Sequence, residues 1–176
     1  MIFIPEPAYQ GILEVLPILC VDCVITFEGR CLLLSRNSEP AKGQRWLTGG
    51  RVHKNETLHA AALRKAYEEA GLPCQFRAVV SIEETMFPQV GDMASDLHTV
   101  NICCHLTASD LSTISIDSSH SDSRWVDKDE ANSMTLHASV RAPLLACLTA
   151  LESLDSREQG PAASYPRVAN AGRAVN

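Results

Sequence analysis

The chain has 176 residues, of which 45% are hydrophobic, and its formal net charge is −6 at pH 7. This length suits one globular domain with a sizeable core, and the hydrophobic content argues against a disordered chain. The negative charge argues against nonspecific binding to nucleic acid or to an anionic membrane. An acidic protein that handles phosphates must gather its positive charges at one place or use a metal ion.

The chain has 7 cysteines, an odd number. Cys20 and Cys23 have the spacing of a redox or zinc pair, but they lie in an alternating apolar run and no second pair with adjacent histidines follows. Buried reduced thiols are the better interpretation. The sequence shows no signal peptide and no apolar run of membrane length. We therefore expect a protein of the reducing cytoplasm.

The first part of the chain predicts a short helix, then a β-hairpin, then a polar loop. These are residues 5–16, strands 18–27 and 31–35 around a turn at 28–30, and loop 36–48. Arg36 and Arg51 bracket the loop. Each could bind a phosphate, because a guanidinium offers two parallel donors to an oxyanion. Taken alone, each would be interpreted as a surface arginine.

Residues 49–72, GGRVHKNETLHAAALRKAYEEAGL, form the most informative stretch. A glycine turn and a polar loop lead into a helix predicted over 57–70. We expect Asn55 to cap this helix, with Glu56 adding negative charge in its first turn. Gly71 should end it.

The charged residues of this helix form neighbouring pairs. Arg64 and Glu68 are one turn apart, and so are Lys65 and Glu69. Glu69 could hold a hard cation beside the carbonyl of the glycine turn, since Mg²⁺ prefers oxygen ligands. For an arbitrary helix, an amphipathic surface with solvated charges would be the simpler interpretation.

The second half predicts strands and a closing helix. A strand at 76–83 precedes a loop at 85–97, which is long enough to contact a substrate. Further elements are a strand at 98–106, an element starting at 114, a mobile polar loop around His120 that returns as a strand at 124–126, an acidic cap-like segment at 127–134 and a helix at 136–154. Pro143 should lie in the first turn of this helix or kink it. Residues 155–176 read as a disordered tail.

The helix and the glycine turn carry a resemblance to a known family. The spacing of Gly50, Glu56, Arg64, Glu68, Glu69, Gly71 and Leu72 resembles the Nudix box. Two positions depart from it, because Lys65 stands where the box has a glutamate and Ala66 where it has a larger aliphatic residue. The block from Arg36 through Pro40 and Gly43 to the Gly-Gly-Arg-Val turn is similar to the GDP-mannose mannosyl hydrolase branch of the family.

This resemblance implies a fold and an activity. The fold would be α/β, with a mixed β-sheet sandwiched between α-helices, in a single Nudix domain over residues 1–154. The activity would be Mg²⁺-dependent hydrolysis of a nucleoside diphosphate sugar such as GDP-mannose, with Mn²⁺ as an alternative ion. Water would attack the anomeric carbon and release GDP. The branch also implies a homodimer.

The resemblance assigns roles by position. Gly50 and Glu69 would hold the metal, with Glu68 available for a second ion. Arg36 and Arg51 would bind and stabilise the diphosphate. His120 would be the general base, although by itself it would be interpreted as a solvated loop histidine.

Further departures from the branch keep other functions open. Ser119 stands where the branch has a metal-binding glutamine, Thr48 replaces a proline, and Trp46 is one place late. A second hypothesis is therefore an ordinary Nudix pyrophosphohydrolase that cleaves at phosphorus, which the pair Glu68 and Glu69 favours and Lys65 disfavours. A third is a nucleotide-binding module without catalysis.

Overall fold

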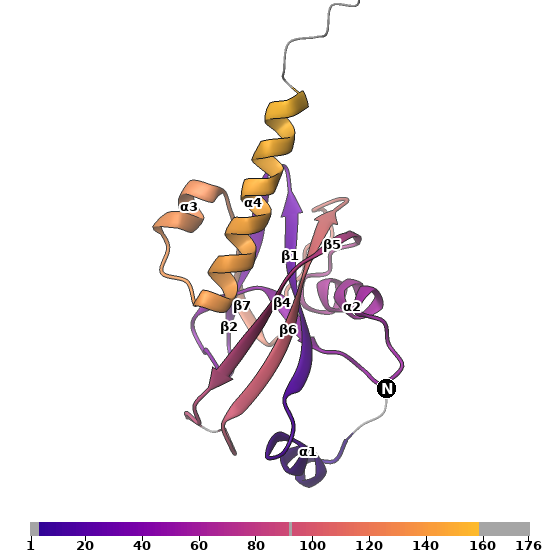
Figure 1. The fold of residues 1–176 in the computed structure, drawn as a ribbon, viewed down its shortest axis with the longest axis vertical. Coiled ribbons are helices and arrows are strands. Elements are labelled where there is room, and N and C mark those ends of the chain that lie inside the picture. Colours follow the sequence, from indigo (N-terminus) through magenta and orange to yellow (C-terminus); the bar gives the residue numbers. More distant parts are fainter. Residues whose placement is uncertain (1–3, 92, 159–176) are drawn as a thin grey trace, which may run out of the picture.

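A seven-stranded mixed sheet lies between helices in the computed structural model, which describes residues 4–91 and 93–158 (Figure 1). The strand order is β3-β2-β1-β6-β5, while β4 pairs with β1 and β7 with β2. β1 and β6 are parallel and the other pairs are antiparallel. The predicted α/β fold with a mixed sheet and flanking helices is confirmed. The strands are β1 Ile18–Phe27, β2 Arg30–Arg36, β3 Arg45–Trp46, β4 Thr48–Arg51, β5 Cys74–Phe87, β6 Leu97–Ala108 and β7 His120–Val126.

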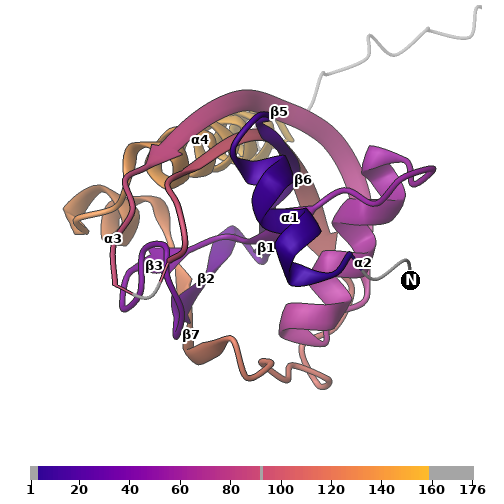
Figure 2. The same ribbon diagram turned by 90° about the horizontal axis from the view of Figure 1, so that it is seen from below.

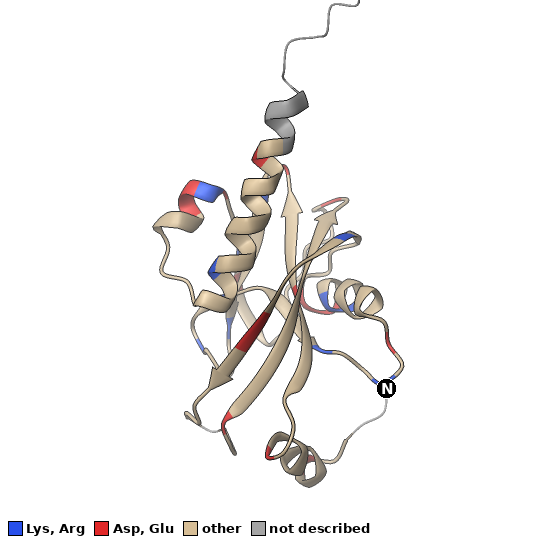
Figure 3. Cartoon of the chain, in the orientation of Figure 1, with Lys and Arg blue, Asp and Glu red and all other residues tan. Residues whose placement is uncertain are grey.

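Two hydrophobic clusters hold the layers together, one on each face of the sheet. Alternating residues of β1 reach opposite faces, as the period of a strand requires. Val21 and Ile25 belong to the cluster under helix α2 (Leu58–Ala70), whereas Val24 belongs to the cluster under helix α4 (Ala138–Glu158). The alanines of α2 allow it to pack closely, because Ala61, Ala62, Ala66 and Ala70 are all fully buried. Figure 3 shows that the strands are largely uncharged, whereas α2 carries charges of both signs.

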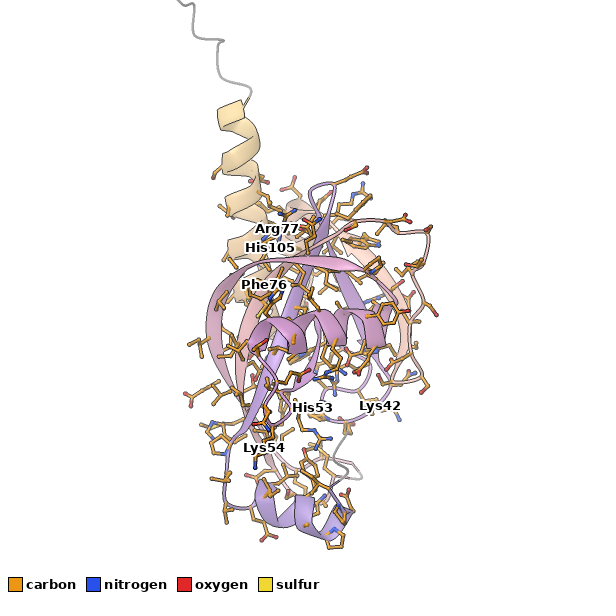
Figure 4. The ribbon with its side chains drawn as sticks, turned by 90° about the vertical axis from the view of Figure 1, so that its right-hand side faces the viewer. Lys42, His53, Lys54, Phe76, Arg77 and His105 are labelled. Carbon is orange, nitrogen blue, oxygen red and sulfur yellow. The ribbon has the colours of Figure 1, made fainter. Side chains whose placement is uncertain are left out.

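Helix α2 begins later than the sequence predicts. Thr57 is the N-cap, and its hydroxyl accepts a hydrogen bond from the Ala60 amide at 3.1 Å. The prediction that Asn55 caps the helix is wrong, because Asn55 adopts a left-handed turn conformation with φ of 67° in the preceding loop. Gly71 ends the helix at φ of 67°, as expected. In Figure 4, His53 and Lys54 mark the loop beneath α2.

Several segments differ from the predicted loops because they pair with strands elsewhere in the sheet. The predicted polar loop at 36–48 contains β3 and the start of β4, which pair with β2 and β1. The predicted loop at 85–97 is shorter, because its first three residues belong to β5 and its last to β6. No strand starts at 114 in the described chain, and the next strand begins at His120. Short strands of this kind are set by their partners rather than by a local pattern.

The last elements follow the prediction more closely. The acidic segment forms helix α3 (Lys128–Ser133), and Asp127 and Glu130 cap it reciprocally. Pro143 lies inside α4, beyond its first turn. The helix continues to Glu158, and the remainder of the predicted tail, 159–176, lies outside the described residues.

Helix α1 (Glu6–Leu13) sits at one end of the sheet rather than on either face (Figures 1 and 2). None of its residues is buried, so this helix does not contribute to the hydrophobic core. Among the described residues, no helix is both long and apolar enough to cross a membrane. All seven cysteines are free thiols, and burial raises the pKa of Cys20 to about 12, so this thiol stays protonated at neutral pH.

Candidate active site

One pocket of about 350 Å³ brings together residues from both halves of the chain. It lies within the size range of small-molecule sites. Five predicted site residues line it: Arg36, Gly50, Arg51, Glu69 and His120. Glu68, the sixth, is not part of its lining. The three segments that carry the predicted roles, 36–51, the box helix and the region around residue 120, therefore meet at one place.

Strand pairing explains why Arg36 and His120 meet. They are partners across β2 and β7, and a register shift between Ser35 and Arg36 interrupts the ladder just before them. Such bulges redirect side chains at the ends of strands. His120 is therefore the first residue of a strand and only 7% exposed, and the prediction that it lies in a mobile loop is wrong.

A carboxylate orients the His120 ring. The Nδ1 atom of His120 lies 2.8 Å from Asp117 Oδ1, and the Ser119 hydroxyl donates to the same oxygen at 2.7 Å. A carboxylate only accepts, so Nδ1 carries the proton and Nε2 has the free lone pair in the neutral ring. Burial raises the pKa of Asp117, but the hydrogen bonds from Ser119 and His120 outweigh it, and the pKa is lowered overall. Asp117 thus stays an acceptor at neutral pH.

Glu69 and the glycine turn form another part of the pocket lining. The Gly49 amide donates to Glu69 Oε2 at 2.9 Å, and Lys65 Nζ lies 2.6 Å from Oε1. Glu69 is only 7% exposed. A side chain at position 49 would overlap Asp22 and the Val21 carbonyl, so only glycine lets β4 approach β1 this closely.

The other charged residues of the box do not line the pocket, and their contacts hold the preceding loop against the helix. Arg64 binds Glu56 through two hydrogen bonds of 2.7 and 2.8 Å, and Glu68 through one of 3.0 Å, as its predicted pairing requires. Glu56 also accepts from the His53 amide at 2.9 Å. The hydrogen bonds from Arg64 lower the pKa of Glu56 to about 2. Glu56 is therefore a structural anchor of the loop and not a residue of the first helical turn.

Two polar residues of the pocket escaped the sequence analysis. Asp22 on β1 and Asn101 on β6 are both buried, and Asn101 Nδ2 donates to Asp22 Oδ2 at 2.7 Å. Burial raises the pKa of Asp22 to about 7, although the hydrogen bond from Asn101 acts in the other direction. The available signal was a carboxylate or amide flanked on both sides by apolar residues, Asp22 within CVDCV and Asn101 within VNIC.

Both pocket arginines lie against aromatic rings. Arg51 Cζ is 4.3 Å from the centre of the Tyr9 ring, and Arg36 Cζ is 6.0 Å from that of Trp46. The Arg36 Nε also donates to the Pro40 carbonyl at 2.8 Å. These contacts orient the guanidinium groups without neutralising their charge. Tyr9 belongs to α1, so this outlying helix reaches the site.

Comparison with known proteins identifies the family. Residues 17–147 match the model of a family described as NUDIX domain, which is more than half of the chain. The chain belongs to the Nudix family. Part of it is also similar to the low-salt glycan biosynthesis protein Agl8 of Haloferax volcanii, at 45% identity over 69 residues. The match takes in 39% of this chain and 44% of that protein, so it spans less than half the length of this curated relative.

Solved Nudix structures share the fold. A NUDIX hydrolase from Nitrosomonas europaea superposes with a TM-score of 0.60 at 21% identity, covering 82% of this chain and 73% of that one. The NUDIX domain of Shewanella oneidensis NrtR, solved with ADP ribose, gives a TM-score of 0.59 at 20% identity, covering 84% and 99%. At these identities the likeness concerns the fold alone.

Nudix hydrolases generally use divalent metal ions such as Mg²⁺. The described residues contain no group of three or more His, Cys, Asp or Glu side chains arranged to hold a metal. Glu69 and Gly50 line the pocket together, and one carboxylate with a backbone carbonyl suits a Mg²⁺ ion that is otherwise held by substrate and water. The donor set therefore fits one ion. Glu68 is bound to Arg64 and lies 3.4 Å from Lys65, and Ser119 is bound to Asp117, so neither extends this set.

Proposed function

We propose that this Nudix protein hydrolyses a nucleoside diphosphate sugar, with GDP-mannose as the first substrate to test. Water attacks the anomeric carbon, and the products are GDP and the free sugar. The observation that carries this proposal is His120, which lines the same pocket as Arg36, Arg51 and Glu69 and is oriented from behind the lining by its hydrogen bond with Asp117. It supplies a base in a chain whose box lacks the carboxylate at position 65.

His120 takes the proton from the attacking water. Its Nδ1 proton is held by Asp117, so the Nε2 lone pair is left as the acceptor. Nε2 makes no hydrogen bond within the described part of the chain. An imidazole accepts protons near neutral pH, and the adjacent carboxylate stabilises the imidazolium that forms.

Arg36 and Arg51 bind the diphosphate as it departs. Their guanidinium groups offer paired donors to phosphate oxygens, and the negative charge of the leaving group grows as the glycosidic bond breaks. Glu69 and Gly50 would hold one Mg²⁺, which when bound neutralises part of that charge. Positioning and charge neutralisation at the diphosphate therefore come mainly from side chains of the protein.

Two observations favour attack at carbon over attack at phosphorus. Cleavage at phosphorus in this family relies on several metal ions and a box carboxylate, and Lys65 replaces one such carboxylate. Glu68, which the alternative would need as a ligand, is outside the pocket lining. The similarity of part of the chain to a glycan biosynthesis protein also supports a sugar-linked substrate.

The test is to incubate the protein with GDP-mannose and Mg²⁺ in ¹⁸O-labelled water. We expect GDP, with the label in free mannose. GMP with the label in a phosphate product would instead establish cleavage at phosphorus. Binding of nucleotides without turnover, across a panel of nucleoside diphosphate sugars and ADP ribose, would support the binding module. A His120→Ala sample controls for contaminating hydrolases.

A homodimer and a cytoplasmic location stay predictions. The first rests on the resemblance to the mannosyl hydrolase branch and the second on the free thiols and the sequence. Light scattering of the purified chain and localisation of a tagged chain would test them.

A further inference from the structure

Lys65 occupies the wall of the pocket at the position where the Nudix box has a glutamate. Its Nζ lies 2.6 Å from Glu69 Oε1 and 3.4 Å from Glu68 Oε2. Its side chain is 16% exposed and lines the pocket. Lysine side chains usually extend into solvent, so this burial beside a candidate metal ligand calls for a functional explanation.

The glycine turn accommodates the Lys65 side chain. Gly50 has φ of 144°, and a Cβ atom there would lie 3.0 Å from Lys65 Cε and 3.5 Å from Nζ. The lysine stem therefore lies against the bare backbone at Gly50, and its ammonium lies beside Glu69. Gly50 and Glu69 are the two residues that would hold Mg²⁺. The ammonium thus shares its immediate surroundings with the metal position.

The charges of the pocket lining favour an anionic ligand. Its lining carries three permanently or normally cationic side chains, Arg36, Arg51 and Lys65, against two carboxylates, Asp22 and Glu69. The chain as a whole has a net charge of −6, so this local excess of positive charge is opposite to its average. Three cationic side chains in one pocket lining suit a diphosphate.

We propose that Lys65 is a diphosphate-binding residue that takes the place of a second metal ion in this active site. In the resting protein its ammonium is paired with Glu69, and on binding it contacts the substrate diphosphate together with Arg36 and Arg51. The inference rests on the proposed function for its substrate class. It adds that diphosphate binding is partly independent of metal, and that the site takes one divalent ion because the ammonium excludes another.

The first test measures binding of inorganic pyrophosphate in EDTA by calorimetry, and so needs neither turnover nor a chosen nucleotide. Wild type should bind it, and Lys65→Met should bind about 10- to 100-fold more weakly, the loss expected for one charge-assisted hydrogen bond. Lys54→Met is the matched control. Lys54 is exposed in the loop before α2 and does not line the pocket, so its removal should leave affinity unchanged (Figure 4).

The second test counts Mn²⁺ ions by electron paramagnetic resonance of the free ion. Lys65→Glu should bind one more Mn²⁺ than wild type, whereas Lys65→Met should gain none, because methionine removes the ammonium without adding an oxygen ligand. Circular dichroism confirms that both variants are folded.

Several results would overturn the inference. Wild type without metal-free affinity for pyrophosphate would do so, as would Lys65→Met with unchanged affinity or Lys65→Glu with no added Mn²⁺. Failure of the proposed function looks different. In that case GDP-mannose is not cleaved at carbon, yet pyrophosphate binding still depends on Lys65.

Discussion

The two faces of helix α2 use the same residue types for different purposes. On the face toward the loop, Arg64 binds Glu56 and Glu68 and shapes the box. On the face toward the pocket, Lys65 pairs with Glu69 beside the glycine turn. The charges of the first network pair mainly with one another, and Glu68 also lies 3.4 Å from Lys65 Nζ. The second is open to a ligand, since both residues line the pocket. Whether a charged pair is structural or functional therefore depends on what it faces.

The largest expected effect is the difference in turnover between substitutions of Glu69, which lines the pocket, and of Glu68, which does not. Glu69→Gln should lower Mg²⁺-dependent turnover by ~10³-fold or more, because a metal ion contributes several kcal/mol to charge stabilisation. Glu68→Gln should stay within about fivefold of wild type, as for a partly exposed ion pair. Steady-state kinetics at saturating Mg²⁺ measures both. Equal effects of the two substitutions would remove the distinction between the faces.

His120→Ala should lower the maximal rate by ~10²–10⁴-fold if His120 is the general base. The dependence of kcat on pH should also change, because the group that takes the proton from water is removed. Ser121→Ala, on the next residue of β7, is the matched control and should keep both rate and profile. An unaltered profile in His120→Ala would assign the base to another group.

The structural role of the Arg64–Glu56 pair can be tested by measuring the free energy of unfolding. Glu56→Gln should lower the free energy of unfolding by ~2–3 kcal/mol at pH 7, since hydrogen bonds to charged groups are lost. The pKa of Glu56 is lowered to about 2 in the folded protein, from an ordinary value of 4.5. Its contribution is therefore complete above pH 4.5 and is lost as the pH falls toward 2.

Urea denaturation of wild type and Glu56→Gln at pH 7 and pH 2.5 measures this difference. The difference in free energy of unfolding between the two proteins should be smaller at pH 2.5 than at pH 7. A constant gap would mean that the Glu56 carboxylate does not act through its charge.

The smallest expected effect concerns Asp22 in the pocket. Burial raises its pKa to about 7, so the folded protein is penalised for ionising it above that pH. Asp22→Asn should therefore stabilise the chain by ~1–2 kcal/mol at pH 8 and have little effect near pH 4, where the carboxyl is protonated in the fold. Thermal unfolding in EDTA at the two pH values measures it. Equal changes in unfolding temperature at pH 4 and pH 8 would show that ionisation of Asp22 is not involved.

Much of the fold could be predicted from local pattern. β1 has the predicted bounds, and the box helix ends at the predicted glycine. Both follow from apolar periodicity and from glycine, which act over a few residues. The N-cap was predicted at Asn55 but is Thr57. Both residue types cap helices well, and only the path of the loop distinguishes them.

The sequence by itself determined the family pattern: the glycine turn, the charged helix and the lysine at position 65. The tertiary structure decided what surrounds these residues. It placed His120 opposite Arg36, Asp117 within hydrogen-bond distance of His120 Nδ1, and Asp22 beside Asn101. The Arg36–His120 and Asp22–Asn101 contacts each join residues more than 70 positions apart in the sequence. Both depend on strand register, and the first also depends on the bulge beside Arg36. Local periodicity contains no information on such pairings, because packing of the whole sheet sets them.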